Sequence, residues 1–255
     1  MKISFIGSGN AATHLATLFT KAGHTVETVY SAHPAHAQRL AKKIKAKAVR
    51  KISDTLSGDC LIIALKDDRI RDVVRMLPVT DCLVLHTSGT ESLSLLSKKF
   101  NNCGVLYPVQ TFSIHSPAPE EVPFCIEASN SSSLAKAKKL ARSISRQVQV
   151  MNSMERKTVH LAAVFVNNFT NHLFTLAEDL LKKKKLKLEI LRPLVQETVS
   201  KIRRQSPSEV QTGPASRGDS KTLREHLALL AGDKTTRAIY RMISQSINPD
   251  ASGQK

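Results

Sequence analysis

The sequence has no tryptophan, and aromatic residues make up only 4% of it. A surface of aromatic rings on which nucleic-acid bases could stack is therefore not expected. Long apolar runs are also missing, since none approaches the roughly 20 residues that a membrane-spanning helix needs. These two absences argue against nucleic-acid and membrane partners.

Acidic residues are few as well. There are 21 of them against 38 Lys and Arg, which gives a net charge of +17 and raises nucleic acid as a partner. The excess is spread evenly, because residues 1–151 carry 20 basic and 11 acidic side chains (+9) and residues 152–255 carry 18 and 10 (+8). Since no basic arm stands out, nucleic acid is the less favoured partner, and the role of the charge stays open.

Paired cysteines of the C-x-x-C type are absent. The four cysteines are widely spaced, and each lies in or beside an apolar, strand-like run; they are Cys60, Cys82, Cys103 and Cys125. We therefore expect free, buried thiols rather than disulfides or a metal site.

The segment from Lys2 to Ala12, KISFIGSGNAA, predicts a buried strand, a G-x-G-x-x-A turn and the start of a helix. The first glycine permits the tight turn, and the second lets the backbone approach a pyrophosphate, which the helix N-terminus attracts. The expected cofactor-binding residues of this turn are Gly7, Ser8, Gly9, Asn10 and Ala11. Because the turn begins at residue 7, we expect no signal peptide and a cytoplasmic location.

The end of the second strand, 25–30, bears on the choice between NADP and NAD. An acidic residue there would bind the ribose 2′-OH of NAD, whereas this chain has Ser31, with Arg39 on the following helix. This favours NADP, with NAD still possible, and Leu65 and Lys66 at the end of a later strand complete the predicted cofactor site. The alternative is that Ser31 only caps the helix and the basic residues face solvent.

Further short apolar strands alternate with helices, as in a parallel sheet covered on both faces. They are expected at 46–49, 60–65, 82–86, 104–107, 124–127 and 148–151, and helices at about 155–185, 189–204, 222–231 and 235–246 follow them. We predict an α/β protein: a Rossmann-type, doubly wound, mostly parallel sheet (1–151), then an all-α helical domain for substrate binding and dimerisation (152–247) and a disordered tail (248–255).

The first long helix carries apolar residues on more than one face, which is typical of a central buried helix. Its apolar surface is broader than a domain of this size covers for itself, so we expect a homodimer formed around Phe165 and Phe169. Asn168 interrupts the apolar face and needs a polar partner or a ligand.

Ligands of such sheets bind beyond the carboxyl ends of the strands. His86 ends a strand there and is the preferred proton-transfer candidate, because its ordinary pKa near 6.5 allows exchange at neutral pH. A purely structural hydrogen bond is an equally good interpretation. Tyr107, Gln110 and Thr111 follow another strand and are predicted to bind the substrate, although Tyr107 could also serve only in packing.

The loop at 211–219 contains charges suited to a substrate, on Arg217 and Asp219, and His226 follows on the next helix. We predict that these three residues meet Asn168 and His86 around one pocket at the domain junction. The catalytic candidates there are His86, Asn168, Asp219 and His226, and Arg217 is predicted to bind the substrate. In the alternative interpretation, Asp219 is only the N-cap of the next helix and Arg217 pairs with it.

Five motifs together carry a family resemblance: FIGSGNAA, VLHTSGT, GVLYPVQTFS, AAVFVNNFTNHL and TGPASRGD. The chain resembles Rossmann-like proteins whose carboxyl half is domain of unknown function 2520. That family is similar to deazaflavin-dependent NADP oxidoreductases and, more distantly, to pyrroline-carboxylate reductases. The resemblance implies an NADP-binding domain followed by a helical domain that often dimerises, with no established substrate.

The chain departs from the pattern at two places. Family members commonly carry Arg just after the second strand, where this chain has Ala32, and Arg39 is a possible substitute. Related hydroxyacid dehydrogenases have a catalytic Lys one turn before an Asn, and here Val164 stands four residues before Asn168. That lysine is therefore not available for catalysis in this chain.

We expect an NADP-dependent oxidoreductase that moves hydride between NADP(H) and a small carbonyl or imine compound. The alternative from another class is a non-catalytic NADP-binding sensor or assembly protein, which would bind the cofactor tightly without turnover.

Overall fold

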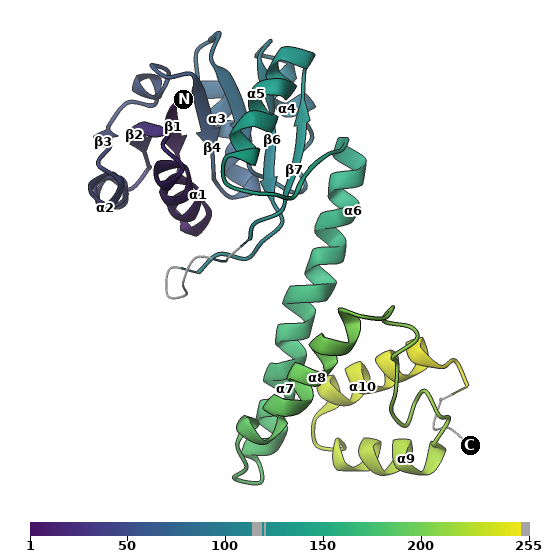
Figure 1. Ribbon diagram of the computed structural model, residues 1–255. Helices are drawn as coiled ribbons and strands as arrows, with labels where there is room; N and C mark the ends of the chain where they lie inside the picture. The colour runs from purple at the N-terminus through teal and green to yellow at the C-terminus, as the bar shows by residue number, and fades with distance from the viewer. Residues whose placement is uncertain (114–118, 120, 251–255) are drawn as a thin grey trace. The chain divides into compact units, whose positions relative to one another are not determined.

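The computed structural model describes residues 1–113, 119 and 121–250 (Figure 1). It divides into two compact units, residues 1–168 and 169–255. This division falls within the long helical segment, because the start of that segment packs against the sheet through Val159. The assignment of residues 152–247 to substrate binding and dimerisation stays a prediction. Of the predicted disordered tail, residues 251–255 lie outside the described part of the chain.

The first unit is built on an eight-stranded sheet of order β3-β2-β1-β4-β5-β6-β7-β8. Its strands are β1 Lys2–Ile6, β2 Thr25–Tyr30, β3 Lys47–Val49, β4 Cys60–Ile63, β5 Leu83–His86, β6 Cys103–Pro108, β7 Phe124–Ala128 and β8 Val148–Val150. All neighbouring strands are parallel except the antiparallel pair β6 and β7. The predicted fold class is confirmed, and every strand is found within two residues of its expected place.

Helices cover both faces of this sheet. Alternate strand residues point to opposite faces, so Phe5 and Ile62 pack under α1 Asn10–Lys21, α2 Pro34–Ile44 and α5 Ser131–Arg142. Strand residues that point to the opposite face, such as Ile63, pack under α3 Asp67–Met76 and the short α4 Ser94–Ser97. A short 3₁₀ helix, η1 Ile52–Thr55, precedes β4. The carboxyl ends of β1, β4, β5 and β6 therefore meet at one edge, where loops leave the sheet.

The helical segment after β8 is not the single uniform helix that the sequence predicts. It consists of α6 Ser153–Ala163, a π-helical stretch Val164–Phe169 and α7 Thr170–Lys182. Its apolar side chains are also not buried in the single chain: Phe165 is 60% exposed and Val166 is 75% exposed. The expectation of a buried central helix is thus wrong for the single chain, because helical periodicity reports an apolar surface but not what covers it.

The second unit continues from α7 with a 3₁₀ turn, Leu188–Leu191, then α8 Arg192–Ile202, α9 Ser220–Leu229 and α10 Lys234–Ile247. Helices α8, α9 and α10 end within two residues of their predicted positions, and α9 and α10 also begin within two. The first turn of the helix predicted at 189–204 is the 3₁₀ turn, so α8 begins later. Asn248 donates its side-chain amide to the carbonyl of Ala215 at 3.1 Å and so fixes the end of α10. Among the described helices, none is long and apolar enough to cross a membrane.

Candidate functional site

The glycine turn has the geometry of a phosphate site. Gly7 has φ +118°, and a Cβ there would lie 2.1 Å from the carbonyl oxygen of Ala64, so only glycine fits between the two strands. Gly9 precedes α1 and meets no atom within 4 Å of its Cβ position. The first helical bond runs from the N–H of Thr13 to the carbonyl of Gly9, so the N–H groups before it have no helical partner. No acidic side chain lies in this first turn, which leaves it suited to an anion.

Polar side chains surround this turn. The hydroxyl of Ser8 donates to that of Ser31 at 2.9 Å, which ties the turn to the end of β2. The amide of Asn10 donates to the carbonyl of Phe112 at 3.0 Å, and His14 stacks on the Phe112 ring at 5.1 Å. The segment that follows β6 therefore lies against the start of α1, the helix predicted to hold the cofactor phosphates.

The other predicted cofactor residues differ in their surroundings. Arg39 is exposed on α2, Leu65 is half-buried beside Gly7, and Lys66 is the exposed N-cap residue of α3. Arg39 forms no ion pair with a described residue, so its guanidinium is available to an anion. Ala32 offers no such group.

His86 is completely buried at the end of β5. Its Nδ1 accepts a hydrogen bond from the backbone N–H of Ser88 at 3.2 Å. Burial, and then the positive charge of Arg156, lower the pKa of His86 to about 3, so the ring is neutral at physiological pH. This geometry favours the structural interpretation of His86 over the proton-transfer interpretation.

A second histidine, His160 on α6, lies at the same edge of the sheet. The Tyr107 hydroxyl and His160 Nδ1 are hydrogen-bonded at 3.0 Å, with the rings edge to face at 5.8 Å. A Cβ at Gly89 would lie 2.6 Å from His160 Nδ1, so the loop after β5 approaches the imidazole as closely as glycine allows. Burial raises the pKa of Tyr107, so the phenol keeps its proton at neutral pH.

Tyr107 and His160 line a cavity of about 630 Å³ together with Gln110, Thr111 and Asn168. All the predicted substrate residues of the first unit and one predicted catalytic residue thus share one hollow. Its remaining walls are mainly apolar. Val109 follows β6, and the other residues, including Val159 and Val164, come from α6 and the π-helical stretch. His86 does not line it, so the expectation that His86 and Asn168 face one pocket is not met within this unit. The physical reason is that the His86 side chain turns into the protein interior.

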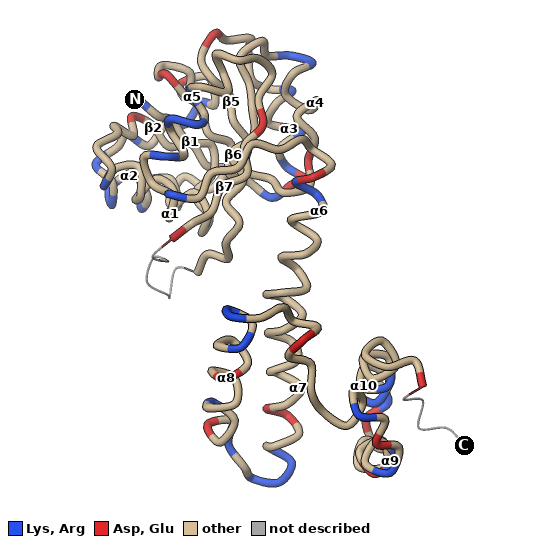
Figure 2. Tube along the Cα trace, turned by 45° about the vertical axis from the view of Figure 1, so that its right-hand side comes forward, with Lys and Arg blue, Asp and Glu red and all other residues tan. Residues whose placement is uncertain are grey.

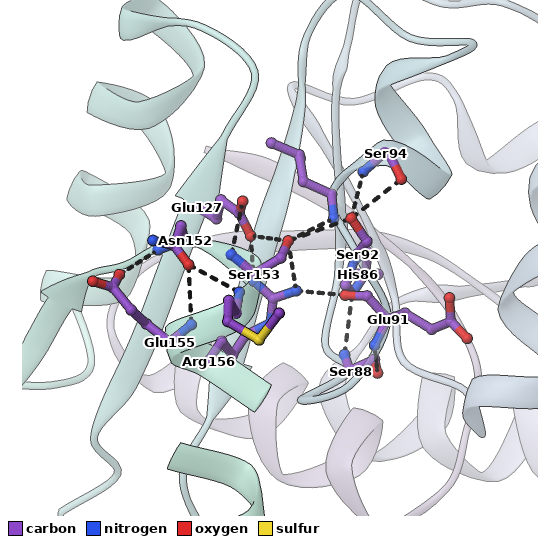
Figure 3. A network of polar contacts seen from close by, with 12 residues as sticks. His86, Ser88, Glu91, Ser92, Ser94, Glu127, Asn152, Ser153, Glu155 and Arg156 are labelled. Atoms are coloured by element: carbon purple, nitrogen blue, oxygen red, sulfur yellow. Dashed lines mark hydrogen bonds and ion pairs between the residues drawn. The ribbon is translucent and has the colours of Figure 1, made fainter. Parts of the chain in front are cut away.

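A buried ion pair fixes the start of α6 (Figure 3). Arg156 is 0% exposed, and its guanidinium contacts the Glu127 carboxylate and the carbonyl of Glu91. Ser153 donates to the same carboxylate at 2.8 Å, while Asn152 caps the helix in a reciprocal arrangement with Glu155. Because Arg156 stands one helical turn before His160, this network sets the position of the imidazole.

The predicted residues of the second unit have local partners. Asp219 caps α9 by accepting the N–H of Thr222 at 3.1 Å and its hydroxyl at 2.8 Å, and these bonds lower the Asp219 pKa. Arg217 is exposed, and His226 Nδ1 lies 2.8 Å from the Tyr240 hydroxyl. The cap that the sequence offered as the alternative role of Asp219 is present. The prediction that Arg217, Asp219 and His226 join Asn168 spans the two units and stays a prediction.

Sequence reasoning did not single out His160 or Arg156. One signal could have found them, because Arg156, His160, Val164 and Asn168 recur every four residues and so share one helix face. An Arg and a His on an otherwise apolar face need partners.

Comparison with known proteins follows the division of the chain. The fold and the glycine turn define a Rossmann-type dinucleotide-binding protein. Residues 2–85 match the family described as NADP oxidoreductase, coenzyme F420-dependent, and residues 122–247 match domain of unknown function DUF2520. Among curated protein sequences, none matches this chain.

Solved structures agree with these matches. A candidate NADP oxidoreductase from Bacteroides fragilis is 35% identical over 97% of this chain and 98% of its own, with a TM-score of 0.89. The reductive aminase of Aspergillus terreus in complex with NADPH and ethyl-5-oxohexanoate is 16% identical, with a TM-score of 0.75 over 99% of this chain and 95% of its own. A 1-pyrroline-5-carboxylate reductase from Streptococcus pyogenes is 16% identical, with a TM-score of 0.65 over 96% and 98% of the two chains.

The chain therefore belongs to the family of NADP oxidoreductases that join a Rossmann domain to a DUF2520 domain. The resemblance, the enzyme class and the NADP cofactor predicted from the sequence are confirmed at the level of this family. The two more distant structures show the fold alone.

Proposed function

We propose that this protein transfers hydride between NADP(H) and a small carbonyl or imine compound bound in the cavity beside Tyr107. The observation that carries the proposal is the hydrogen-bonded pair of Tyr107 and His160 in the wall of that cavity. Reduction of C=O or C=N needs one hydride and one proton, and NADPH supplies the hydride when bound. The chain has to supply the proton and hold the reacting group.

Tyr107 is suited to donate the proton. Its pKa is raised by burial, so the hydroxyl is protonated, and an oxygen or nitrogen that gains negative charge would take that proton. His160, hydrogen-bonded to the phenol at 3.0 Å, would return a proton to it from solvent. The Asn168 side chain, in the wall of the same cavity, offers an amide donor to the carbonyl oxygen.

A second tyrosine and histidine pair allows a matched test. Tyr240 and His226 in the second unit have a similar bond and ring geometry, at 2.8 Å and 5.6 Å. We expect Tyr107→Phe to lower kcat about 100-fold or more, the usual size of a general-acid contribution, with NADPH affinity unchanged. Because the proposal assigns no chemical step to His226 or Tyr240, Tyr240→Phe should leave turnover nearly unchanged.

The assay follows NADPH absorbance and product mass with a pool of carbonyl and amine compounds. Equal turnover by wild type and Tyr107→Phe would remove the pair from the mechanism. Tight NADPH binding without turnover of any compound would instead favour the sensor or assembly protein.

We further propose that Arg39 binds the 2′-phosphate of NADP. It would take the role of the arginine that family members commonly carry after the second strand, where this chain has Ala32. The support is its exposed guanidinium on α2, the helix that follows Ser31. NADPH should bind more tightly than NADH. Arg39→Ala should weaken NADPH binding and leave NADH affinity unchanged, so that the difference between the two affinities becomes smaller. Titration of both nucleotides by fluorescence measures this, and an unchanged ratio would assign the 2′-phosphate to another residue.

We also propose a homodimer. The support is a set of apolar side chains exposed in the single chain on the helices from α6 to α8, which are Leu161, Phe165, Val166, Phe169, Leu173, Ile190 and Leu194. Exposed apolar surface of this kind marks protein interfaces.

A further inference from the structure

The first unit contains a basic groove between α3, α4 and α6, with a volume of about 1100 Å³. Five cationic side chains line it, and one carboxylate, Glu91, does so as well. The cations are Arg71, Arg75, Lys98, Lys99 and Lys157. Across the two units, by contrast, basic residues are scattered over many elements (Figure 2). A concave surface with this excess of positive charge attracts anions.

Two of the five cations already have partners in the protein. Lys99 donates its ammonium to the carbonyls of Val74 and Arg75, at 2.9 and 3.0 Å. Arg75 lies 3.9 Å from the Asp72 carboxylate. The other three, Arg71, Lys98 and Lys157, form no ion pair with any residue that the structure describes, and each is exposed. Their charges are therefore available to a ligand.

The cofactor phosphates do not account for these cations. The glycine turn leads into α1, which packs on one face of the sheet with α2 and α5. The groove is built by α3 and α4, which pack on the opposite face. NADP bound at the start of α1 leaves Arg71 and Lys98 without a counter-ion.

His160 connects the groove to the candidate site. His160 and Val164 line both the groove and the cavity that contains Tyr107. A ligand whose charged end lies among Lys98 and Lys157 therefore has the imidazole as a neighbour, and that imidazole is hydrogen-bonded to Tyr107 in the adjoining cavity.

We propose that the substrate carries an anionic group, a carboxylate or a phosphate, which Arg71, Lys98 and Lys157 bind while its carbonyl or imine faces Tyr107 and His160. This inference rests on the proposed function and narrows its substrate class. The three cations act on binding and orientation and take no part in the chemical step.

The test uses the full-length protein saturated with NADP⁺, so that the glycine turn is occupied. Inorganic pyrophosphate is titrated by calorimetry into wild type and into Arg71→Ala/Lys98→Ala/Lys157→Ala. The matched control is Lys21→Ala/Lys136→Ala/Arg142→Ala, which removes the same types and number of exposed charges from α1 and α5. We expect the first variant to bind pyrophosphate about tenfold more weakly, the size expected for three partly solvated ion pairs, and the control to match wild type. Equal affinities in the three proteins would overturn the groove as an anion site.

A second measurement compares a keto acid with its neutral ester, levulinate with ethyl levulinate, at saturating NADPH. The acid should have the lower KM, and the groove variant should raise that KM about tenfold while kcat and the KM of the ester stay unchanged. A wild-type preference for the ester would overturn the proposed substrate class. Selective pyrophosphate binding without turnover of any carbonyl or imine compound would contradict the proposed function while the anion site stands.

Discussion

Two glycines that follow sheet strands allow close contacts at the candidate site, because a Cβ atom at either position would clash with a neighbouring residue. Gly7 lets β1 pass close to Ala64, and Gly89 lets the loop after β5 approach His160. Both contacts join segments far apart in the sequence. A methyl group at either position therefore disturbs a site rather than only a turn.

We predict that Gly89→Ala lowers turnover at least tenfold, because a Cβ 2.6 Å from His160 Nδ1 must displace the imidazole from Tyr107. Gly232→Ala is the control, since nothing lies within 4 Å of the Cβ it would add. Steady-state kinetics and a thermal unfolding curve separate the two effects. Unchanged turnover in a folded Gly89→Ala protein would show that the contact is not needed.

Gly9 tests the cofactor site itself. Gly9→Asp should abolish NADPH binding and leave the fold intact, because its side chain enters open space and brings a negative charge to the place of the pyrophosphate. Gly9→Ala adds the Cβ without the charge and should bind NADPH more tightly than Gly9→Asp. Fluorescence titration and circular dichroism measure both properties, and full NADPH affinity in folded Gly9→Asp would place the pyrophosphate elsewhere.

His86 makes stability depend on pH. Its folded pKa of about 3 lies below the unfolded value of about 6.5, so the unfolded chain takes up the proton first as pH falls. The stabilisation is complete above pH 6.5 and is lost progressively between about 6.5 and 3. From pH 7 to 4.5 this loss is roughly 2–3 kcal/mol, which His86→Gln should remove from the pH dependence of urea unfolding. An imidazole of His86 that titrates near pH 6.5 by NMR would contradict the burial argument.

At the level of elements, α6 depends on one buried ion pair. Removing one partner of such a pair leaves an uncompensated charge, so Arg156→Met should cost about 3–5 kcal/mol of unfolding free energy. Adding Glu127→Gln should recover part of that loss. The control is Lys182→Met in an exposed pair with Glu178, which should cost less than about 1 kcal/mol.

Chemical denaturation gives these free energies, and turnover of the Arg156→Met protein gives a second readout. If α6 is set by the pair, turnover should fall even where the protein is fully folded, because His160 lies one turn further along. A destabilised protein with wild-type turnover would limit the pair to a structural role.

The helical segment from Ser153 to Lys182 was predicted in part by the spacing of its apolar residues. The apolar spacing predicted a long helix from about residue 155, and helix does run from Ser153 to Lys182, interrupted by the π-helical stretch. The spacing of apolar residues did not predict that interruption. A π-helical turn contains one extra residue, and the amino-acid composition of the segment does not reveal it. The helical periodicity of apolar residues also did not predict that Phe165 is exposed in the single chain.

At the level of the whole molecule, the exposed apolar surface of α6 to α8 leads to a prediction about assembly. The protein should sediment as a dimer at micromolar concentration, and Phe165→Glu should shift it toward monomer, because a charge in an apolar interface is left unpaired. Lys157→Glu, at an exposed position of α6, is the control for an added acidic group. A wild-type monomer by analytical ultracentrifugation would contradict the dimer.

The sequence by itself determined the α/β class, the order of strands and helices and the glycine turn. Each of these depends on interactions between residues close in the chain: alternation in strands, spacing in helices and the freedom of glycine at Gly7. It also proposed Tyr107, Gln110, Thr111 and Asn168 as site residues, and these four line the candidate cavity.

Only the tertiary structure decided which histidine of the first unit lies beside the candidate cavity. The sequence favoured His86 and did not single out His160, because the ionisation and reach of a side chain depend on what other elements place around it. Burial in the protein interior, and then Arg156, lower the pKa of His86, whereas Gly89 and Tyr107 hold His160 in the wall of the cavity. Those neighbours are brought together by the packing of α6 on the sheet, across separations that no local pattern encodes.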